Sequence, residues 1–320
     1  MKKNIFIILV CSIIWGVNLT DAQESSLKVG IMDFTSADEN RNDQKLVSSV
    51  LSAGMGRYSF ISLVERSQLG SLIKEIELSE TGLLDEKTII RAGKVFGLQV
   101  IVDGSISKSG SISARAIYSE TARVIATGAV ASKNDLDTLA KMLASGIETY
   151  IARENLKKLR NDSPDISLNL WLEKKDGTKL AAAGQNGSAK IGTSVVFHFS
   201  SNMDGYITIV DIQPGGDIVV LYPNDFSGSN EINKNEQYAV PSADDGFEIT
   251  VSEPAGEDTL VAFFTKKKVD WLDMKKLSGD GFKSIREGEK VMASRGFNVT
   301  ATSLKKKEWE SVEMTLQVGK

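Results

Sequence analysis

Residues 205–225 read GYITIVDIQPGGDIVVLYPND, two apolar runs separated by a Pro-Gly-Gly step. Pro214-Gly215 suits a type II turn, which favours proline at its second position and glycine at its third. Pro223 then ends strand pairing, because proline has no backbone N–H to donate. Four alternating positions can face one core: Ile207, Ile209, Val219 and Leu221. The stretch predicts a rigid β-hairpin that carries almost no reactive side chains.

Short strand-like runs continue on both sides of this hairpin, and helical periodicity nearly vanishes after residue 164. Alternating or apolar runs occur at 166–173, 194–200, 247–251, 259–265 and 312–318. Many short strands joined by Gly, Asn and Pro turns are typical of a β-sandwich or a barrel-like fold. Residues 165–320 are therefore predicted to form a mainly β, sandwich-like C-terminal domain.

The N-terminal half, residues 28–153, instead alternates strand and helix signals. Strands are expected at 27–34, 60–64, 99–107, 111–118 and 123–130. Apolar stripes at helical spacing predict helices that begin near Asn42 or Asp43, Asp85 and Asn134, and a further helix that carries Leu69, Leu72, Ile73 and Ile76. This order predicts an α/β domain with a mixed sheet and helices packed on it. The charged segment 154–164, which ends in Asn-Asp-Ser-Pro, is the predicted linker between the two domains.

The first 22 residues have the features of an export signal. Residues 1–3, MKK, give a positive start, residues 5–17 form an apolar run, and residues 20–22, TDA, offer the small residues that a signal peptidase reads. We expect cleavage between Ala22 and Gln23, which would leave a chain soluble in the periplasm or associated with the outer membrane. The run is too short to span a bilayer, which takes about 20 residues. A retained N-terminal anchor is the alternative.

The single cysteine, Cys11, lies inside this apolar run, directly after Val10. A lipoprotein has a small residue before its cysteine and is cleaved there, so Val10 argues against the alternative of a lipid-anchored chain that begins at Cys11. Cleavage after Ala22 would remove the thiol. Thiol catalysis and cysteine-based metal sites are then excluded.

Composition excludes few classes of protein. The chain has 320 residues, about two domains' worth, of which 41% are hydrophobic and 25% charged, with a net charge of -4. No segment combines strong positive charge with interleaved aromatic residues, so nucleic acid is not an expected partner.

A set of residues stands in a familiar order along the N-terminal half: Val64-Glu65-Arg66, Gln68-Leu69, Glu75, Leu78-Ser79, Thr81-Gly82-Leu83, Asp85, Gly93-Lys94, Gly97 and Val102-Asp103-Gly104-Ser105. Through these residues the chain resembles the CsgG-type curli secretion-channel family and its relatives, which include periplasmic activators of penicillin-binding proteins. The resemblance covers about residues 28–150. It implies an exported envelope protein that binds an envelope partner or associates with itself.

Channel members of that family insert long hairpins into the outer membrane. Transmembrane strands need about 9–11 residues with one apolar, lipid-facing side. The candidate strands here, 101–107 and 111–118, are short and carry Ser and Arg, and Lys108 stands in the turn between them. We therefore expect a relative of the activators, with no membrane span in the mature chain.

A second set of residues marks the C-terminal half: Asp204-Gly205-Tyr206, Gly216-Asp217, Leu221-Tyr222-Pro223-Asn224, Asn230, Pro241, Phe247, Pro254, Gly256, Glu257 and Trp309. Through them residues 165–320 resemble the bacterial family known as domain of unknown function 4384. This resemblance implies no activity. Members of the family are commonly joined to other exported or signalling domains.

Two short segments are candidate partner contacts. Glu65 and Arg66 stand where a strand passes to a helix, and a local ion pair or cap is the alternative interpretation. Tyr222, Pro223 and Asn224 would lie at a loop mouth on a rigid base, a common place for recognition. The alternative there is a strand end with a core tyrosine.

No residue set typical of catalysis or of a cofactor site stands out. His198, the single histidine, lies in a strand between two phenylalanines and is expected to be structural. Residues 38–43 begin like a calcium loop but lack its glycine and its final glutamate. Three acidic groups are expected to be solvated loop residues: Asp244-Asp245, Glu253 and Glu257-Asp258. We expect neither a metal nor a cofactor.

These observations predict a non-enzymatic, exported cell-envelope protein, a partner-binding, scaffolding or activating factor in wall or outer-membrane assembly. One alternative is an oligomeric accessory subunit of a CsgG-type secretion assembly. A second is a carboxylate-dependent cell-wall hydrolase, which would use a carboxyl group such as that of Glu257.

Overall fold

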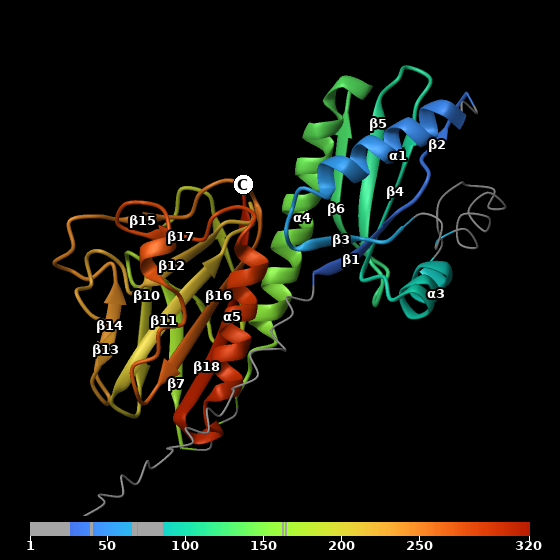
Figure 1. Ribbon diagram of the computed structural model, residues 1–320. Coiled ribbons are helices and arrows are strands. Elements are labelled where there is room, and N and C mark those ends of the chain that lie inside the picture. The colour runs from blue at the N-terminus through green and yellow to red at the C-terminus, as the bar shows by residue number, and fades with distance from the viewer. Residues whose placement is uncertain (1–25, 39–40, 66–68, 70–85, 162, 164) are drawn as a thin grey trace, which may run out of the picture.

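The computed structural model describes residues 26–38, 41–65, 69, 86–161, 163 and 165–320 (Figure 1). The predicted signal peptide, its cleavage site at Ala22-Gln23, Cys11, Arg66 and the predicted helix beyond Leu69 lie outside the described residues. The described chain combines a mixed α/β part with a β-rich part, which confirms the predicted fold class.

The N-terminal unit is built on one mixed sheet, sheet A, with strand order β3-β1-β4-β5-β6 and with β2 beside β4. Its strands are β1 (Leu27–Ile31), β2 (Thr35–Ser36), β3 (Ile61–Leu63), β4 (Val100–Ile106), β5 (Ile112–Tyr118) and β6 (Arg123–Val130). β1 runs parallel to β3 and β4, whereas β4, β5 and β6 form antiparallel hairpins. The predicted order, crossovers first and hairpins later, is confirmed.

Helices cover both faces of sheet A. They are α1 (Arg41–Met55), α3 (Glu86–Phe96) and the first half of α4 (Leu136–Lys157). Val100 and Val102 of β4 enter the core beneath α1 and α4, whereas Ile101 between them packs with α3 on the opposite face. This is the two-residue alternation of a strand covered on both sides.

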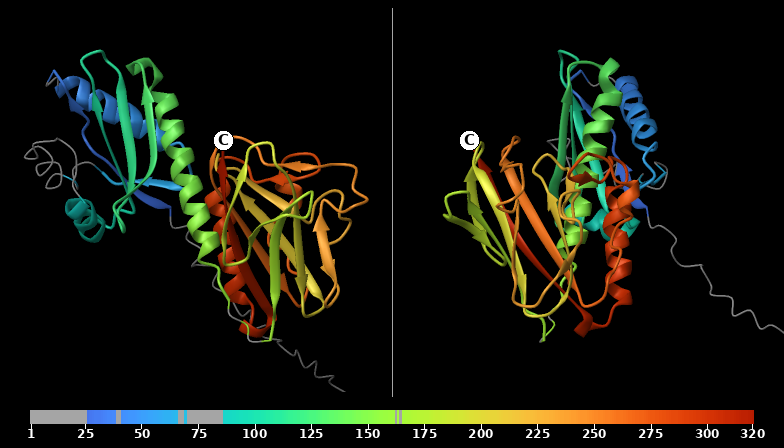
Figure 2. Two further views of the ribbon diagram at one scale, coloured as in Figure 1. Left: turned by 180° about the vertical axis from the view of Figure 1, so that it is seen from behind. Right: turned by 90° about the vertical axis from the view of Figure 1, so that its left-hand side faces the viewer.

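The C-terminal unit contains two sheets packed face to face, sheet B and sheet C (Figure 2). Sheet B has the order β14-β10-β7-β8 with β15 beside β10. Its strands are β7 (Leu168–Lys174), β8 (Lys179–Ala182), β10 (Ser194–Ser201), β14 (Gln237–Val240) and β15 (Ile249–Thr250). Sheet C has the order β17-β12-β11-β16-β18-β9 with β13 beside β11. Its strands are β9 (Asn186–Lys190), β11 (Gly205–Ile212), β12 (Ile218–Tyr222), β13 (Glu231–Ile232), β16 (Gly256–Thr265), β17 (Lys283–Ser284) and β18 (Trp309–Gly319).

The predicted hairpin at 205–222 is the antiparallel pair β11–β12. Ile207, Ile209 and Leu221 lie in the core between the two sheets, with Val219 packed against it. The intervening apolar residues are buried as well, on the outer face of sheet C: Val210, Ile212, Ile218 and Val220. Both faces of these strands are covered, which explains why the runs are apolar almost without interruption.

The turn of this hairpin differs from the prediction. Gly216, and not Gly215, has the left-handed backbone, with φ of 97°. The Gly216 N–H donates to the carbonyl oxygen of Gln213 at 2.9 Å. A type II turn over Gln213–Gly216 would require the left-handed residue at Gly215, so the predicted turn type is wrong.

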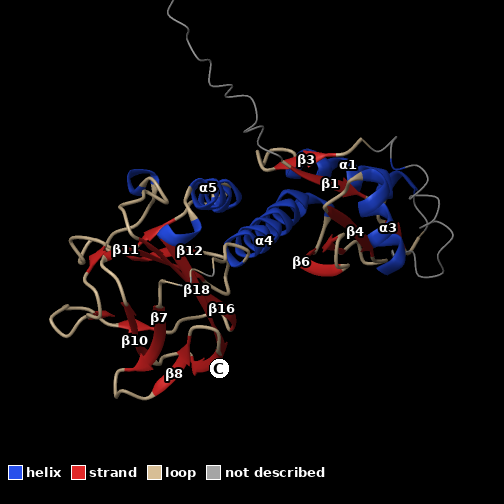
Figure 3. Cartoon of the chain, turned by 90° about the horizontal axis from the view of Figure 1, so that it is seen from below, coloured by secondary structure: helices blue, strands red, loops and turns tan. Residues whose placement is uncertain are grey.

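The outer face of sheet C is covered by α5 (Lys290–Ser303), which lies beside the second half of α4 (Figure 3). This helix was not expected from the sequence. Its buried apolar residues are Val291, Phe297 and Ala301, and the positions between them are mostly small or polar. Such a narrow stripe gives a weak amphipathic signal.

The predicted linker, 154–164, begins inside α4, which continues to Lys157. Leu156 and Leu159 are buried in the core that includes α5. The Asn161 Nδ2 donates to the carbonyl oxygen of Lys306 at 2.7 Å and also to that of Trp309. The segment is therefore packed against the C-terminal unit, and the proposed domain boundaries on either side of it stay a prediction.

Candidate functional site

Helix α4 joins the two units by packing into both, and several polar contacts lie along it. Its first half buries Leu139, Leu143 and Ile147 against sheet A and α1. Its second half buries Ala152 and Leu156 against sheet C and α5. One helix thus contributes to two cores, so its side chains are held relative to both units at once.

Glu148 lies at the middle of this joint and is fully buried. Its carboxylate accepts the backbone N–H of Gly288 at 2.9 Å and that of Lys290 at 2.7 Å. Because α5 begins at Lys290, the carboxylate serves N–H groups that a helix start leaves unpaired. Burial raises the pKa of Glu148, although both hydrogen bonds and the charge of Lys290 favour its ionised form.

The turn of the β11–β12 hairpin docks on the same part of α4. The carbonyl oxygen of Gly216 accepts the Lys290 Nζ at 2.6 Å and the Thr149 hydroxyl at 3.4 Å. A Cβ added to Gly216 would lie 2.3 Å from Thr149 Oγ1. Glycine is therefore required here by the backbone and by the contact with the helix.

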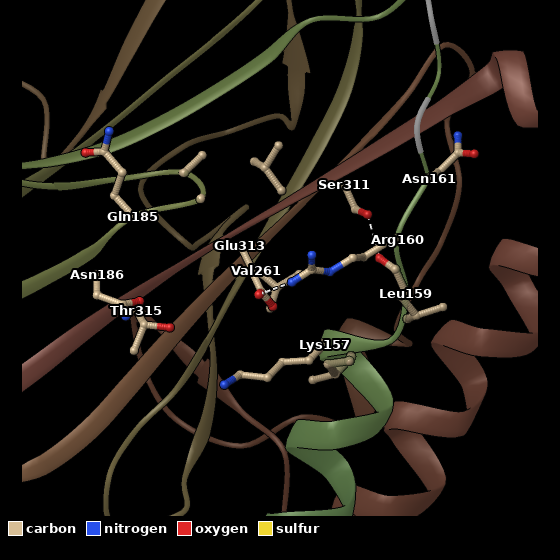
Figure 4. Close-up of a pocket in the computed structure, with 14 residues that line it drawn as sticks. Lys157, Leu159, Arg160, Asn161, Gln185, Asn186, Val261, Ser311, Glu313 and Thr315 are labelled. Carbon is tan, nitrogen blue, oxygen red and sulfur yellow. Dashed lines mark hydrogen bonds and ion pairs between the residues drawn. The ribbon is translucent and has the colours of Figure 1, made fainter.

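A pocket of about 420 Å³ opens beside the end of α4 (Figure 4). It is walled by the last turn of α4, the β8–β9 loop and the outer face of β16 and β18. Its chemistry comes from polar side chains: Lys157, Arg160, Asn161, Gln185, Asn186 and Glu313. In Figure 4 the Lys157 and Arg160 side chains point in the same direction across the pocket.

The charges of this pocket are largely compensated. Arg160 forms an ion pair with Glu313, and the Lys157 Nζ lies 3.0 Å from Glu257 Oε1. Partial burial would raise the pKa of Glu257, but the hydrogen bond to Lys157 and the charges of Lys157 and Arg153 outweigh it and lower that pKa. A carboxyl group held in its ionised form suits the recognition of a polar surface better than proton donation.

The residues proposed as partner contacts are not brought together. Glu65 follows β3 and is exposed. Tyr222 is 7% exposed, its ring centroid lies 5.0 Å from that of Phe199, and burial raises its pKa to about 12. The Asn224 Oδ1 accepts the backbone N–H of Phe226 and of Ser227, each at 2.9 Å. This geometry fits a strand end with a core tyrosine, and a partner contact at Tyr222, Pro223 and Asn224 stays a prediction.

His198 lies on β10, where burial alternates and places Phe197 and Phe199 on the opposite face. Its ring stacks on Trp171 with a centroid distance of 5.1 Å, and its Nε2 lies 3.4 Å from Glu173 Oε2. These contacts are those of a structural histidine.

The part of the chain that the structure describes lacks two features of other protein classes. No cluster of three or more His, Cys, Asp or Glu residues could hold a metal ion there, and part of the candidate calcium loop at 38–43 lies outside that part. No helix of the described residues is long and apolar enough to cross a membrane.

Three acidic residues were misjudged from the sequence. Asp211, inside the hairpin that was predicted to carry almost no reactive groups, lies on β11 and is 6% exposed. Glu257 and Asp258, predicted as solvated loop residues, both lie on β16 and are half-buried. Because Asp211 pairs with Leu260, Asp258 stands on the same face of sheet C, two residues along. The sequence signal for Asp211 was a single carboxylate in an apolar run. Its pairing with Asp258 depends on the register between two strands.

Comparison with known proteins confirms both family resemblances. Residues 44–137 match the model of the family described as curli production assembly/transport component CsgG. Residues 188–268 match the model of the family described as domain of unknown function (DUF4384). No curated protein matches the chain.

Three solved structures show distant likeness. The LpoB C-terminal domain from Salmonella enterica has 16% identity and a TM-score of 0.27, over 34% of this chain and 84% of that one. The corresponding domain from Escherichia coli has 14% identity and a TM-score of 0.27, over 34% and 84%. A lipoprotein from Neisseria meningitidis has 11% identity and a TM-score of 0.25, over 33% and 82%.

Proposed function

We propose that this chain is a non-enzymatic, exported accessory protein of the cell envelope that binds a protein partner in wall or outer-membrane assembly. The CsgG family match and the export-signal pattern of the first 22 residues support the compartment. The observation that carries the proposal is helix α4, which is packed into both units. In this proposal both units contact the partner, and α4 holds the C-terminal unit in a fixed orientation relative to the CsgG-like unit.

Rigid coupling is what a scaffolding role needs. Units joined by an open linker move independently unless their interface is large and apolar. Here α4 spans both units, Val291 of α5 enters the core of the N-terminal unit, and the buried Glu148 bonds the start of α5. The orientation of one unit would therefore be fixed relative to a partner bound to the other unit.

The pocket beside the end of α4 is the proposed contact surface in the C-terminal unit. Its Arg160 side chain is 70% exposed although it is paired with Glu313, and Gln185 and Asn186 are exposed at its rim. Exposed guanidinium and amide groups over a partly apolar floor are typical of protein-binding surfaces.

A photo-crosslinking amino acid tests this surface in cells that export the chain. Placed at Gln185, it should yield one discrete crosslinked envelope protein, and Arg160→Glu should weaken that product. Placed at Val299, which is 69% exposed on α5, it should not. The proposal fails if both positions give the same products or if neither captures an envelope protein.

The molar mass in solution distinguishes the accessory protein from the alternative of a CsgG-type secretion subunit. The accessory-protein proposal expects a monomer in light scattering at high protein concentration, whereas a ring subunit would give a defined multiple of the chain mass. A concentration-independent oligomer would favour the secretion assembly.

The hydrolase alternative rests on an acid such as Glu257. A glycosidase acid needs a raised pKa so that it is protonated before catalysis, whereas the pKa of Glu257 is lowered. We expect no turnover of peptidoglycan by the natural chain. Turnover that disappears in Glu257→Gln would overturn this conclusion and restore the hydrolase.

A further inference from the structure

A second cavity, of about 290 Å³, lies between sheet B and sheet C, at the end of the sandwich where the β11–β12 hairpin turns. This volume is near the lower end of ordinary ligand pockets, which span about 300–1,000 Å³. Most of its wall is apolar and includes Leu172, Phe197, Leu221 and Leu260. The cavity is separate from the pocket at the end of α4, with which it shares no lining residue.

Two carboxyl groups stand on one wall of this cavity, those of Asp211 and Asp258. The Asp211 residue is 6% exposed, and no group of the described chain bonds its Oδ1; the same holds for the Oδ1 of Asp258. The Asp211 Oδ2 accepts from Gln213 Nε2 at 3.4 Å, a weak bond. Apart from the hydrogen bond that the two carboxyl groups share, these two buried oxygens have no donor among the described residues.

The charges around the pair do not supply that donor. Arg153 of α4 is near enough to affect both carboxyl groups, yet its Nη2 donates to the backbone carbonyls of Gln213 and Glu257, at 3.4 and 3.3 Å. Glu253, at the cavity mouth, is exposed and adds another negative charge. Burial raises the pKa of both aspartic acids, so the pair tends to retain a proton when the cavity holds no cation.

Stability alone does not account for this arrangement. A buried carboxyl group without a full set of hydrogen bonds costs free energy, and an apolar residue at either position would extend the core. Carboxyl pairs that flank a scissile sugar bond stand about 5–9.5 Å apart, whereas these two are hydrogen-bonded to each other. Two carboxylates are also too few for a calcium site, which takes six to eight oxygens.

We propose that this cavity binds an alkylammonium group, whose nitrogen is held by Asp211 and Asp258 and whose alkyl chain lies against the apolar wall. An ammonium carries three N–H donors and no acceptor, so it can replace the proton that the two carboxyl groups share and donate to their oxygens. The same chemistry can come from a free aliphatic amine or from a lysine side chain of a partner. This proposal does not depend on the partner-binding function proposed above.

Isothermal titration of the purified full chain tests the proposal, with n-hexylamine as the probe and n-hexanol as its uncharged counterpart. We expect n-hexylamine to bind at least about tenfold more tightly than n-hexanol, the difference that one charge-assisted hydrogen bond makes. N-acetyl-lysine amide is the second probe, and its tighter binding would identify a partner's lysine as the source. Equal binding of n-hexylamine and n-hexanol, or binding of neither amine probe, would overturn the proposal.

Variants of the two aspartic acids test whether n-hexylamine binds at this site. Asp258→Asn and Asp211→Asn should each weaken n-hexylamine binding at least about tenfold while the fold is kept, because a neutral amide is cheaper to bury. Asp244→Asn removes a carboxylate from an exposed loop and should leave n-hexylamine binding unchanged.

Binding should release the proton that the Asp211–Asp258 pair retains, so the heat of binding measured in phosphate buffer and in HEPES buffer should differ. Should both variants unfold, identical heats in the two buffers would by themselves contradict the carboxyl pair as the site.

Discussion

At the scale of single residues, Gly216 decides how the β11–β12 hairpin meets helix α4. Gly216→Ala should lower the free energy of unfolding by about 2–4 kcal/mol, because it combines left-handed backbone strain with overpacking against Thr149. Gly177→Ala is the matched control, since its φ is 85° and an added Cβ would meet nothing within 4 Å. It should lose only the strain, about 1–2 kcal/mol. Urea denaturation measures both, and equal losses would show that the turn does not press on α4.

Asp211 should make stability depend on pH. Its folded-state pKa is raised above the ordinary value of 3.8 by burial and by Asp258, so the folded chain retains a proton that the unfolded chain releases. The free energy of unfolding therefore falls as pH rises from about 3.8 towards the raised pKa. Asp211→Asn should gain stability relative to the natural chain across this range. Denaturation at several pH values checks this, and a difference that stays constant across the range would contradict it.

Residue roles were predictable from the sequence where they follow from local pattern. The alternation around His198 places it opposite two phenylalanines, as the structure confirms. The pairing of Asp211 with Asp258 was not predictable, because it requires the register between β11 and β16, which lie far apart in the chain. The left-handed residue of the turn was misassigned because Gly215 and Gly216 are adjacent glycines and either can adopt a positive φ.

At the scale of elements, Phe297 is the one aromatic side chain by which α5 packs on sheet C. Phe297 is fully buried, with ring centroids 5.0 Å from Phe263 and 5.4 Å from Trp271. Phe297→Ala should cost about 3–5 kcal/mol and weaken the near-ultraviolet circular dichroism of the tryptophans. Val299→Ala, on the exposed side of the same helix, should leave both unchanged. Retention of the natural spectrum in Phe297→Ala would show that α5 is held by other contacts.

Elements with a clear period were the predictable ones. The strands of the hairpins and helix α4 carry long apolar patterns, whereas α5 packs through three apolar residues and small neighbours. The segment 154–164 has the charged composition of a linker, yet its Leu156 and Leu159 are buried. Composition reports average polarity, and a few buried residues decide whether such a segment packs.

At the scale of the whole molecule, the shared helix predicts one cooperative unfolding transition. Trp15 lies in the predicted signal peptide, and the other three tryptophans, Trp171, Trp271 and Trp309, lie in the C-terminal unit. In the chain without residues 1–22, tryptophan fluorescence therefore follows that unit, whereas far-ultraviolet circular dichroism follows both. The two urea curves should coincide in the natural chain. Glu148→Ala, which removes the bonds to Gly288 and Lys290, should separate them. Separate curves in the natural chain would show that α4 does not couple the units.

The place of β18 in sheet C sets the order in which the molecule can assemble. This strand, Trp309–Gly319, lies between β16 and β9, although the eleven other described strands of the two C-terminal sheets and β1–β6 precede it in the chain. A ribosome or an export channel delivers it after all of them, and until it arrives β16 and β9 each have an unpaired edge. Such edges are templates for pairing with other chains. Completion of sheet C therefore waits for delivery of the last strand, and a chain cut before Trp309 should aggregate instead of folding.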